Sequence, residues 1–343
     1  MKSIHESLNK QYYDKSSWIL ILLPLSFIYL IIITIRSWAY KIGIFKTIRI
    51  DVPVVVVGNI TIGGTGKTPL IIWLLDKLIK LGMKPGIISR GYNSNVNFPQ
   101  EVFTDSEVSN VGDEALMMKL RHQRDDLNIP IFVGKKRAQV GKALLKSYPD
   151  VNILISDDGL QHYELYRDFE IVVVDETRQF GNEFLIPAGP LREGVTKASK
   201  VDALVINSQF LKKNSTDKNG NLAYGMNYYG DLLVNCFNNK ISDLGALENE
   251  VVVITGIGNP ERFFKQLSTA GLKFKKIVFN DHHLFLESDF KEYVDMDIIM
   301  TEKDAVKCKN FAKKNFWYLP IHANVDEGLL KKLMKKLRII ING

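Results

Sequence analysis

A short apolar segment that leads into a glycine-rich loop constrains the fold of this chain more than any other feature. Val52–Val57 is almost entirely β-branched, as expected of a central parallel strand that is buried on both faces. The loop Gly63–Thr68 (GGTGKT) follows, and Pro69–Leu81 has the pattern of an amphipathic helix. A strand, a glycine-rich turn ending in Lys-Thr and a helix, in this order, predict a nucleotide-binding α/β domain.

The loop has the groups needed to hold nucleotide phosphates. Glycine lets backbone N–H groups turn toward phosphate oxygens, and the N-terminus of the following helix adds a partial positive charge. We expect Lys67 to contact the β- and γ-phosphates and the Thr68 hydroxyl to bind Mg²⁺. Thr61 stands where the usual motif begins with glycine. The expected nucleotide contacts are Thr61, Ile62, Gly63, Gly64, Thr65, Gly66, Lys67 and Thr68.

A second apolar segment ends in two carboxylates, which favours a metal site beside the phosphate loop. Ile153–Ser156 is followed by Asp157 and Asp158, an arrangement that holds Mg²⁺ directly or through water in nucleoside triphosphatases. Thr301–Asp304 (TEKD) is close to a motif that recognises guanine, but Glu302 stands in its lysine position. We therefore expect ATP, with Mg²⁺, rather than GTP.

An N-terminal apolar stretch predicts a membrane anchor. Trp18–Ile35 contains no charged side chain, and Trp18, Trp38 and Tyr40 stand where interfacial aromatic residues are expected. A cleaved signal peptide is less consistent with the sequence, because basic residues follow the stretch and a small-residue cleavage pattern is missing. A buried core helix is the other alternative. The pattern does not separate a helix that spans the bilayer from one that only inserts.

After the anchor, alternating strand and helix patterns predict a P-loop-type, doubly wound, mostly parallel α/β sheet. A polar segment, 211–221, interrupts the alternation, and 224–237 has the pattern of an antiparallel ribbon with a turn at Gly230-Asp231. The alternation resumes at Val251, which indicates a second, smaller α/β lobe. We expect an anchor helix at 1–45, a P-loop core at 46–207, a smaller lobe with its ribbon linker at 208–325, and a basic amphipathic helix at 326–343.

For this last helix we expect docking on the core through its leucines, with contact to anionic lipid as the alternative. The net charge of +7 is too small and dispersed to indicate nucleic acid, but it suits an anionic membrane surface or substrate. The two cysteines, Cys236 and Cys308, have neither zinc-site nor disulfide-framework spacing, which favours a reducing compartment.

Two further polar clusters contain groups that could accept a proton from a phosphate acceptor. Val111–Glu114 places a carboxylate pair at a predicted helix start, and Asp281–His283 follows a strand of the second lobe. A carboxylate and a histidine facing each other across a cleft between lobes could form a general base. The alternatives are that Asp113 only caps its helix and that the histidine pair is structural.

Taken together, these blocks resemble the tetraacyldisaccharide 4′-kinases of lipid A biosynthesis over nearly the whole chain. The matching blocks, in order, are Val57–Pro69, Ser89–Tyr92, Val111–Glu114, Asp157–His162, Pro187–Glu193, Asp281-His282 and Thr301–Lys307. Ala115 and Leu160 depart from the family pattern at positions that carry no chemistry. The resemblance implies transfer of the ATP γ-phosphate to the 4′-hydroxyl of a tetraacylated glucosamine disaccharide 1-phosphate, with Mg²⁺, at the cytoplasmic face of a Gram-negative inner membrane.

The resemblance also implies roles for individual residues. Asp113 resembles the general base, His282 its partner in a dyad, with His283 as the alternative, and Lys67 the phosphate ligand. The implied metal contributors are Thr68, Asp157, Asp158 and Glu193. The implied substrate contacts are Arg90, Tyr92, Glu114, Gln161, His162 and Arg192.

The expected partners are the lipid A disaccharide precursor and the inner-membrane bilayer, without nucleic acid, and we expect a monomer. A membrane-tethered nucleotide-hydrolysing switch or a transport component is the alternative function. That alternative calls for a transporter-type signature or a complete guanine-recognition motif, and the sequence contains neither.

Overall fold

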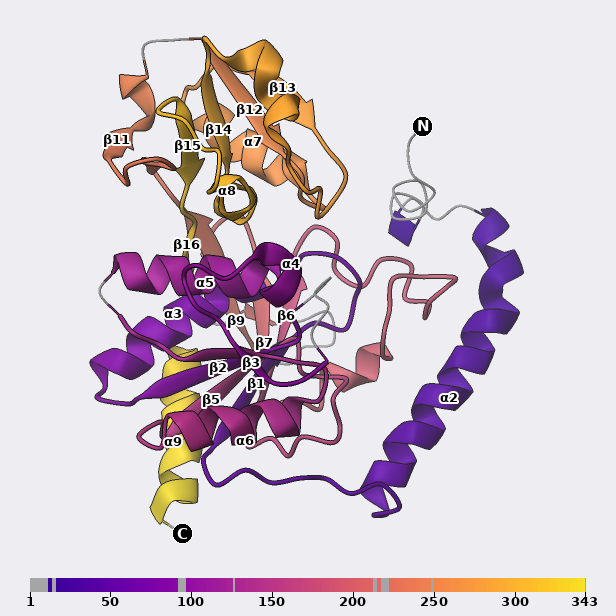
Figure 1. The fold of residues 1–343 in the computed structure, drawn as a ribbon. Coiled ribbons are helices and arrows are strands. Elements are labelled where there is room, and N and C mark those ends of the chain that lie inside the picture. Colours follow the sequence, from indigo (N-terminus) through magenta and orange to yellow (C-terminus); the bar gives the residue numbers. More distant parts are fainter. Residues whose placement is uncertain are drawn as a thin grey trace.

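A computed structural model describes residues 12–13, 17–91, 97–125, 127–211, 215–216, 222–247 and 250–342. Two mixed, mostly parallel sheets form two lobes, and a long apolar helix runs beside the larger one (Figure 1). The predicted α/β class is therefore confirmed. Tyr92 and most of the polar segment 211–221 lie outside the described residues.

The larger sheet has ten strands among the described residues, in the order β16-β9-β7-β6-β1-β5-β2-β4-β3, with β8 paired to β9. The strand bounds are β1 Val54–Gly58, β2 Pro85–Ser89, β3 Gln100–Glu101, β4 Ile131–Val133, β5 Ile153–Asp157, β6 Phe169–Asp175, β7 Ala203–Asn207, β8 Ser215–Thr216, β9 Leu222–Tyr229 and β16 His322–Val325. Strand β1 is central and parallel to β5 and β6, with Val57 opposite Asp157. The carboxyl ends of β1 and β5 therefore meet at one sheet edge.

Helices cover both faces of this sheet, as predicted for a doubly wound fold. The helix bounds are α3 Lys67–Lys80, α4 Val108–Val111, α5 Asp113–Arg124, α6 Arg137–Ser147 and α9 Gly328–Asn342. Buried side chains of α3, α5 and α9 share one apolar core with the sheet. Those of α6 and the loops that follow β5 and β6 form the core of the opposite face.

The smaller lobe has six strands within the described ranges, in the order β11-β10-β15-β14-β12-β13. Its elements are β10 Leu232–Asn235, β11 Ile241–Asp243, β12 Val251–Thr255, α7 Pro260–Thr269, β13 Lys275–Val278, β14 Asp297–Thr301, α8 Glu302–Cys308 and β15 Phe316–Leu319, with short 3-10 turns at Leu244–Ala246 and Glu287–Tyr293. A further 3-10 turn, Val195–Lys197, belongs to the larger lobe.

A β-ribbon joins the lobes, but its pairing differs from the prediction. The chain leaves the larger sheet between β9 and β10, at Gly230-Asp231, and returns between β15 and β16, at Pro320-Ile321. Strand β9 pairs antiparallel with β16 and not with β10, so Gly230-Asp231 is a crossing and not a hairpin turn. The alternating pattern of a half-buried strand does not specify its partner. Because β8, β9 and β16 extend the larger sheet, we propose that the core domain includes them.

The N-terminal helix is mostly exposed. A 3-10 turn, Ser17–Leu22, leads into α2, Leu23–Lys41, and of the helices described here one, Ile19–Lys41, is long and apolar enough to cross a membrane. Only 11% of its most apolar window is buried, which excludes the core-helix alternative. Its exposed apolar residues include Ile21, Leu25, Phe27, Ile28, Ile31, Ile32 and Ile35. Such a surface indicates membrane association.

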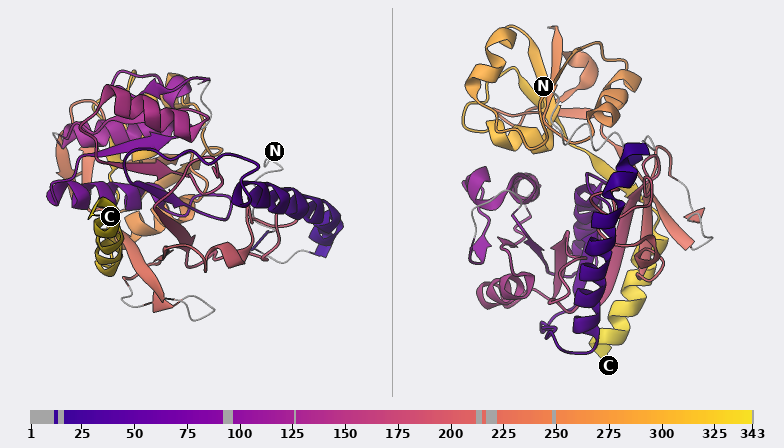
Figure 2. Two further views of the ribbon diagram at one scale, coloured as in Figure 1. Left: turned by 90° about the horizontal axis from the view of Figure 1, so that it is seen from below. Right: turned by 90° about the vertical axis from the view of Figure 1, so that its right-hand side faces the viewer.

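One side of α2 contacts the core through polar groups. The Ser26 hydroxyl donates to the Leu185 carbonyl oxygen over 2.8 Å, and the Tyr29 hydroxyl donates to that of Arg192 over 3.0 Å. Further along, Arg36 donates to the Gln161 carbonyl oxygen over 3.2 Å. These contacts span much of the helix, so α2 runs alongside the larger lobe (Figure 2).

Helix α9 docks on the larger sheet, as expected. Leu329, Leu333 and Leu337 are fully buried in the core shared with α3 and α5, while Lys332 and Lys335 are exposed. In Figures 1 and 2 this helix lies across the molecule from α2. Its basic face is therefore the solvated side of a docked helix.

We expect Leu333→Ala to lower the free energy of unfolding by about 2–5 kcal/mol, because it leaves a cavity at a fully buried position. Urea unfolding followed by circular dichroism measures this. Lys332→Ala, one residue away on the exposed face, is the matched control and should change stability by less than about 0.5 kcal/mol. Equal effects of the two substitutions would contradict the docked position.

Candidate active site

A cavity of about 680 Å³ lies between the two lobes, at the edge where β1, β2 and β5 end. The phosphate loop and the end of β5 line it from the larger lobe, and the loop before α7, the loop after β13 and the start of α8 line it from the smaller one. Tyr29 of α2 also reaches the cavity. Each predicted site residue can therefore be compared with the lining of this one cavity.

The phosphate loop has the backbone that its glycines predict. Gly63 and Gly66 have φ angles of +92° and +99°, which side chains other than hydrogen rarely permit. Lys67 begins α3, and its ammonium lies 3.1 Å from Asn59 Oδ1 and 3.4 Å from Asp158 Oδ1. Residues 62–68 line the cavity.

Thr61 differs from the prediction. Its side chain is buried, and its backbone forms an isolated bridge with Leu191. It is not among the residues that line the cavity. Thr61 therefore belongs to the support of the loop and not to its phosphate-facing surface, which explains why glycine is not needed there.

Asp157 and Asp158 have opposite electrostatic environments. Burial raises the pKa of Asp157 to about 7, with help from the charges of Glu114 and Asp158. Burial also favours a higher pKa for Asp158, but the charges of Lys67 and Arg192 outweigh it and hold that pKa well below the usual range. Asp158 has a φ of +49°, a strained conformation that turns its side chain toward these cations.

In each carboxylate Oδ2 forms a hydrogen bond and Oδ1 is buried without one. Asp157 Oδ2 accepts a hydrogen bond from Ser89 over 2.9 Å, whereas its Oδ1 is buried without a hydrogen-bond partner. Arg192 donates to Asp158 Oδ2 over 3.0 Å. An unpartnered buried carboxylate oxygen is costly, so a cation beside Asp157 would remove a penalty.

Glu193, also expected near the metal, does not line the cavity. Tyr163 donates a hydrogen bond to Glu193 Oε1 over 2.9 Å, and burial raises the pKa of Glu193. Among the described residues no group of three or more His, Cys, Asp or Glu side chains is placed to hold a metal ion. We therefore leave Glu193 out of the metal site considered below.

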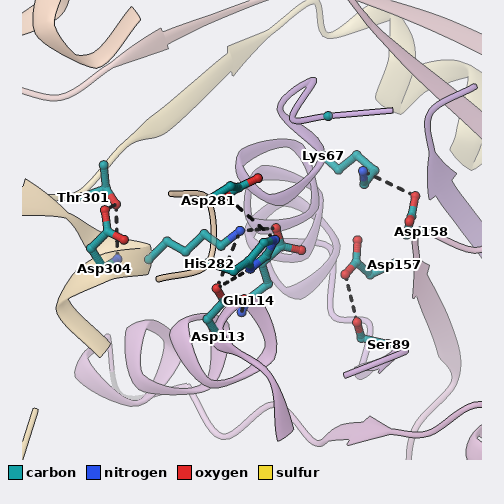
Figure 3. A network of polar contacts seen from close by, with 12 residues as sticks. Lys67, Ser89, Asp113, Glu114, Asp157, Asp158, Asp281, His282, Thr301 and Asp304 are labelled. Carbon is teal, nitrogen blue, oxygen red and sulfur yellow. Dashed lines mark hydrogen bonds and ion pairs between the residues drawn. The ribbon is translucent and has the colours of Figure 1, made fainter. Parts of the chain in front are cut away.

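Asp113 and His282 meet across the two lobes (Figure 3). His282 Nδ1 lies 2.9 Å from Asp113 Oδ2. Lys303 and Lys307 place their ammonium groups 3.7 Å and 3.8 Å from the same oxygen. Burial would raise the pKa of Asp113, but His282 and the two lysines lower it to about 2.

Asp113 is not a helix cap, because Gly112 occupies the N-cap position of α5. Of the pair, His282 lines the cavity and Asp113 lies behind it, 4% exposed. His282 has a φ of +60°, and its backbone N–H donates to the Gly256 carbonyl oxygen over 3.1 Å. Strained backbone at such a position is typical of functional sites.

His283 faces elsewhere, which decides between the two histidines. Its Nε2 lies 3.0 Å from Asp289 Oδ2, and its ring stacks on Phe279 with a centroid separation of 4.4 Å. It does not line the cavity.

The predicted substrate contacts share the cavity with the phosphate loop. All of those within the described residues line it: Arg90, Glu114, Gln161, His162 and Arg192. Burial and the charges of Arg137 and Arg90 lower the pKa of His162 to about 4. Tyr29 lines the same cavity and joins it to α2, a neighbour that no local sequence signal predicted.

The TEKD segment has a structural role. Asp304 is fully buried and accepts hydrogen bonds from the Thr255 and Thr301 hydroxyls over 2.8 and 2.7 Å. It thereby fixes the ends of β12 and β14.

Lys303 and Lys307, which contact Asp113, were missed by sequence reasoning although both lie in a matched block.

The chain matches the family described as Tetraacyldisaccharide-1-P 4′-kinase over residues 18–338. It belongs to this family. The tetraacyldisaccharide 4′-kinases of Methylobacillus flagellatus and Pasteurella multocida are 41% and 39% identical to it, over 98% and 95% of this chain and 97% of each relative. Membership decides against the switch or transport alternative.

A solved structure agrees. The crystal structure of LpxK from Aquifex aeolicus in complex with ATP has a TM-score of 0.77 and 28% identity to this chain, covering 93% of this chain and 99% of that one. The shared fold includes both lobes.

Gly66→Ala should lower the affinity for ATP about tenfold or more, because the new Cβ would require a strained φ and would lie 1.6 Å from Tyr228 Oη. Isothermal titration calorimetry measures the affinity. Gly245→Ala, whose Cβ meets nothing within 4 Å, is the control and should bind ATP as the parent does. Unchanged affinity in Gly66→Ala would contradict the described loop.

Proposed function

We propose that this cavity transfers the γ-phosphate of ATP to the 4′-hydroxyl of a tetraacylated glucosamine disaccharide 1-phosphate, the family's step in lipid A biosynthesis. One observation carries the assignment. The phosphate loop, the Asp157-Asp158 pair and His282, which is hydrogen-bonded to Asp113, face the same cavity, and the apolar helix α2 borders it. A nucleotide, an acceptor hydroxyl and a lipid surface can therefore meet there.

We assign the nucleotide phosphates to residues 62–68. The backbone N–H groups and Lys67 neutralise the phosphate charge, which is the main contribution that a protein makes to phosphoryl transfer. Arg192 and Arg90 also line the cavity and add positive charge to it. The ATP complex of the Aquifex aeolicus relative supports this nucleotide.

The oxygen donors at the end of β5 fit Mg²⁺. Thr68, Asp157 and Asp158 offer hard oxygen atoms, and Asp157 Oδ1 is buried without a hydrogen bond. Two carboxylates are enough because Mg²⁺ takes its remaining ligands from phosphates and water. When bound, the ion would neutralise charge on the transferred phosphoryl group.

For the acceptor proton we propose the Asp113–His282 pair as a unit. His282 Nδ1–H donates a hydrogen bond to the ionised Asp113 carboxylate, which leaves Nε2 as the basic nitrogen. Since His282 lines the cavity and Asp113 lies behind it, we assign the contact with the 4′-hydroxyl to His282, which exchanges the two roles that the family resemblance implies. Asp113, with its pKa lowered to about 2, stays ionised and stabilises the imidazolium that forms.

The membrane partner follows from the lipid. Each CH₂ of an acyl chain costs about 0.8 kcal/mol to expose to water, so the enzyme must reach an acceptor that stays in the bilayer. The exposed apolar side of α2 and the position of Tyr29 support this approach. We propose that the protein acts as a monomer on the cytoplasmic face of a Gram-negative inner membrane.

We expect Lys67→Ala and His282→Ala each to lower kcat about 100-fold or more, because one removes a phosphate contact and the other the proton acceptor. A thin-layer assay with radiolabelled ATP and the disaccharide lipid measures this. His283→Gln is the matched control and should stay within about threefold, since His283 does not reach the cavity. Chelation of Mg²⁺ should stop the reaction until Mg²⁺ is restored. Full activity of His282→Ala would contradict the proton assignment.

The double variant Ile28→Lys, Ile35→Lys should weaken sedimentation with phospholipid vesicles and leave ATP affinity unchanged. Ile28 and Ile35 are 53% and 64% exposed on α2, and lysine there opposes insertion. Leu81→Lys, at a position that is also 53% exposed but at the C-cap of α3, is the control and should sediment as the parent does. Equal sedimentation of all variants would contradict the role of α2.

A further inference from the structure

The Asp113–His282 hydrogen bond is formed between lobes that the chain joins by only two short crossings. Asp113 begins α5 of the larger lobe, and His282 follows β13 of the smaller one, 169 residues away. His282 is tied to its own lobe through Gly256, and Asp113 Oδ1 is tied to α5 through the Glu114 N–H. The distance of 2.9 Å therefore depends on how the lobes are set against each other.

One buried side chain of α5, Arg121, contacts the elements that determine how the two lobes are arranged. Arg121 Nη1 lies 2.9 Å from Glu302 Oε2, at the start of α8, and 2.9 Å from the carbonyl oxygen of Ile321, in a crossing. Arg121 Nη2 donates to His322 Nδ1, the first residue of β16, over 2.9 Å. A single guanidinium thus holds the smaller lobe, the crossing and the larger sheet.

The contacts of Arg121 matter because they join the helix that carries Asp113 to the helix that carries its two lysine partners. Arg121 lies on the same helix as Asp113, and Glu302 lies on the same helix as Lys303 and Lys307, which contact Asp113. A shift of α8 along α5 would move both lysines and the adjoining lobe at once. The Arg121 and Glu302 side chains are only 2% and 10% exposed, so water cannot readily replace their contacts.

Resting on the function proposed above, we propose that Arg121 is a positioning residue that sets the register of the two lobes and so aligns His282 with Asp113. The planar guanidinium is suited to this task because it donates in several fixed directions at once. Lysine at this position keeps the charge, but its donors lie on one nitrogen and cannot reproduce the separate positions of Nη1 and Nη2 that reach Glu302, Ile321 and His322. Arg121→Lys should therefore fold and lose alignment.

A double-mutant cycle with His282 tests this role. Arg121→Lys should lower kcat about tenfold or more while the KM for ATP stays within about twofold, because small misplacements of reacting groups are costly. In a His282→Ala background the same substitution should cost less than about twofold in kcat, since nothing remains to align. Single-turnover assays with radiolabelled ATP measure all four proteins.

The matched control is Lys309→Met. Lys309 also joins the lobes, through the carbonyl oxygens of Thr104 and Ser106, but does not touch the proton-transfer pair or its lysines. Its effect should be the same factor with and without His282. Thermal unfolding of each variant separates misalignment from loss of the folded state.

The outcomes distinguish this inference from the proposed function. Equal losses from Arg121→Lys in the two backgrounds would overturn the positioning role alone. So would a raised KM for ATP with unchanged kcat, because Arg121 lines the cavity and that result would indicate a direct nucleotide contact. Full activity of His282→Ala would overturn the proton assignment and, with it, the positioning role.

Discussion

The hydrogen bond between Asp113 and His282 is the interaction on which this active site depends. It joins a carboxylate of one lobe to an imidazole of the other over 2.9 Å. Two buried lysines reinforce it, and two residues of the site, His282 and Asp158, hold strained positive φ angles. Such conformations persist only where the surrounding structure holds them in place. The smaller lobe therefore supplies one half of the pair to which we assign proton transfer.

The strand order of the larger lobe determines where the phosphate loop and the Asp157-Asp158 carboxylates lie. Because β1 lies beside β5 in parallel, the phosphate loop and the carboxylates must emerge at one edge. That edge faces the smaller lobe, while α2 contacts the loops that follow β5 and β6. In the proposed function, these three elements around one cavity bring ATP, acceptor hydroxyl and bilayer together.

Much of this was predictable from the sequence. The β-branched run before GGTGKT and the carboxylates after Ile153–Ser156 were enough to predict an α/β fold with a nucleotide site, because both patterns are local. The remaining features depend on contacts between distant segments. The partner of β9, the position of Tyr29 and the lysines on Asp113 are set by tertiary packing.

Thr61 and Glu193 are two predicted site residues that tertiary packing places away from the cavity. Each lies in a matched block beside residues that do line the cavity, yet Thr61 is buried with its backbone bridged to Leu191, and the Glu193 carboxylate accepts a hydrogen bond from Tyr163. Position in a motif specifies the neighbourhood of a residue, whereas the direction of its side chain follows from packing. The family blocks therefore predicted the site better than the role of each member.

The state of the His282 ring tests the central claim most directly. Nuclear magnetic resonance of protein labelled with ¹⁵N at its six histidines, with His282 assigned from a His282→Gln variant, reports which ring nitrogen carries the proton. The account predicts a protonated Nδ1 in a hydrogen bond that is lost in Asp113→Ala. A neutral ring protonated at Nε2, or an Nδ1 signal that Asp113→Ala leaves unchanged, would contradict it.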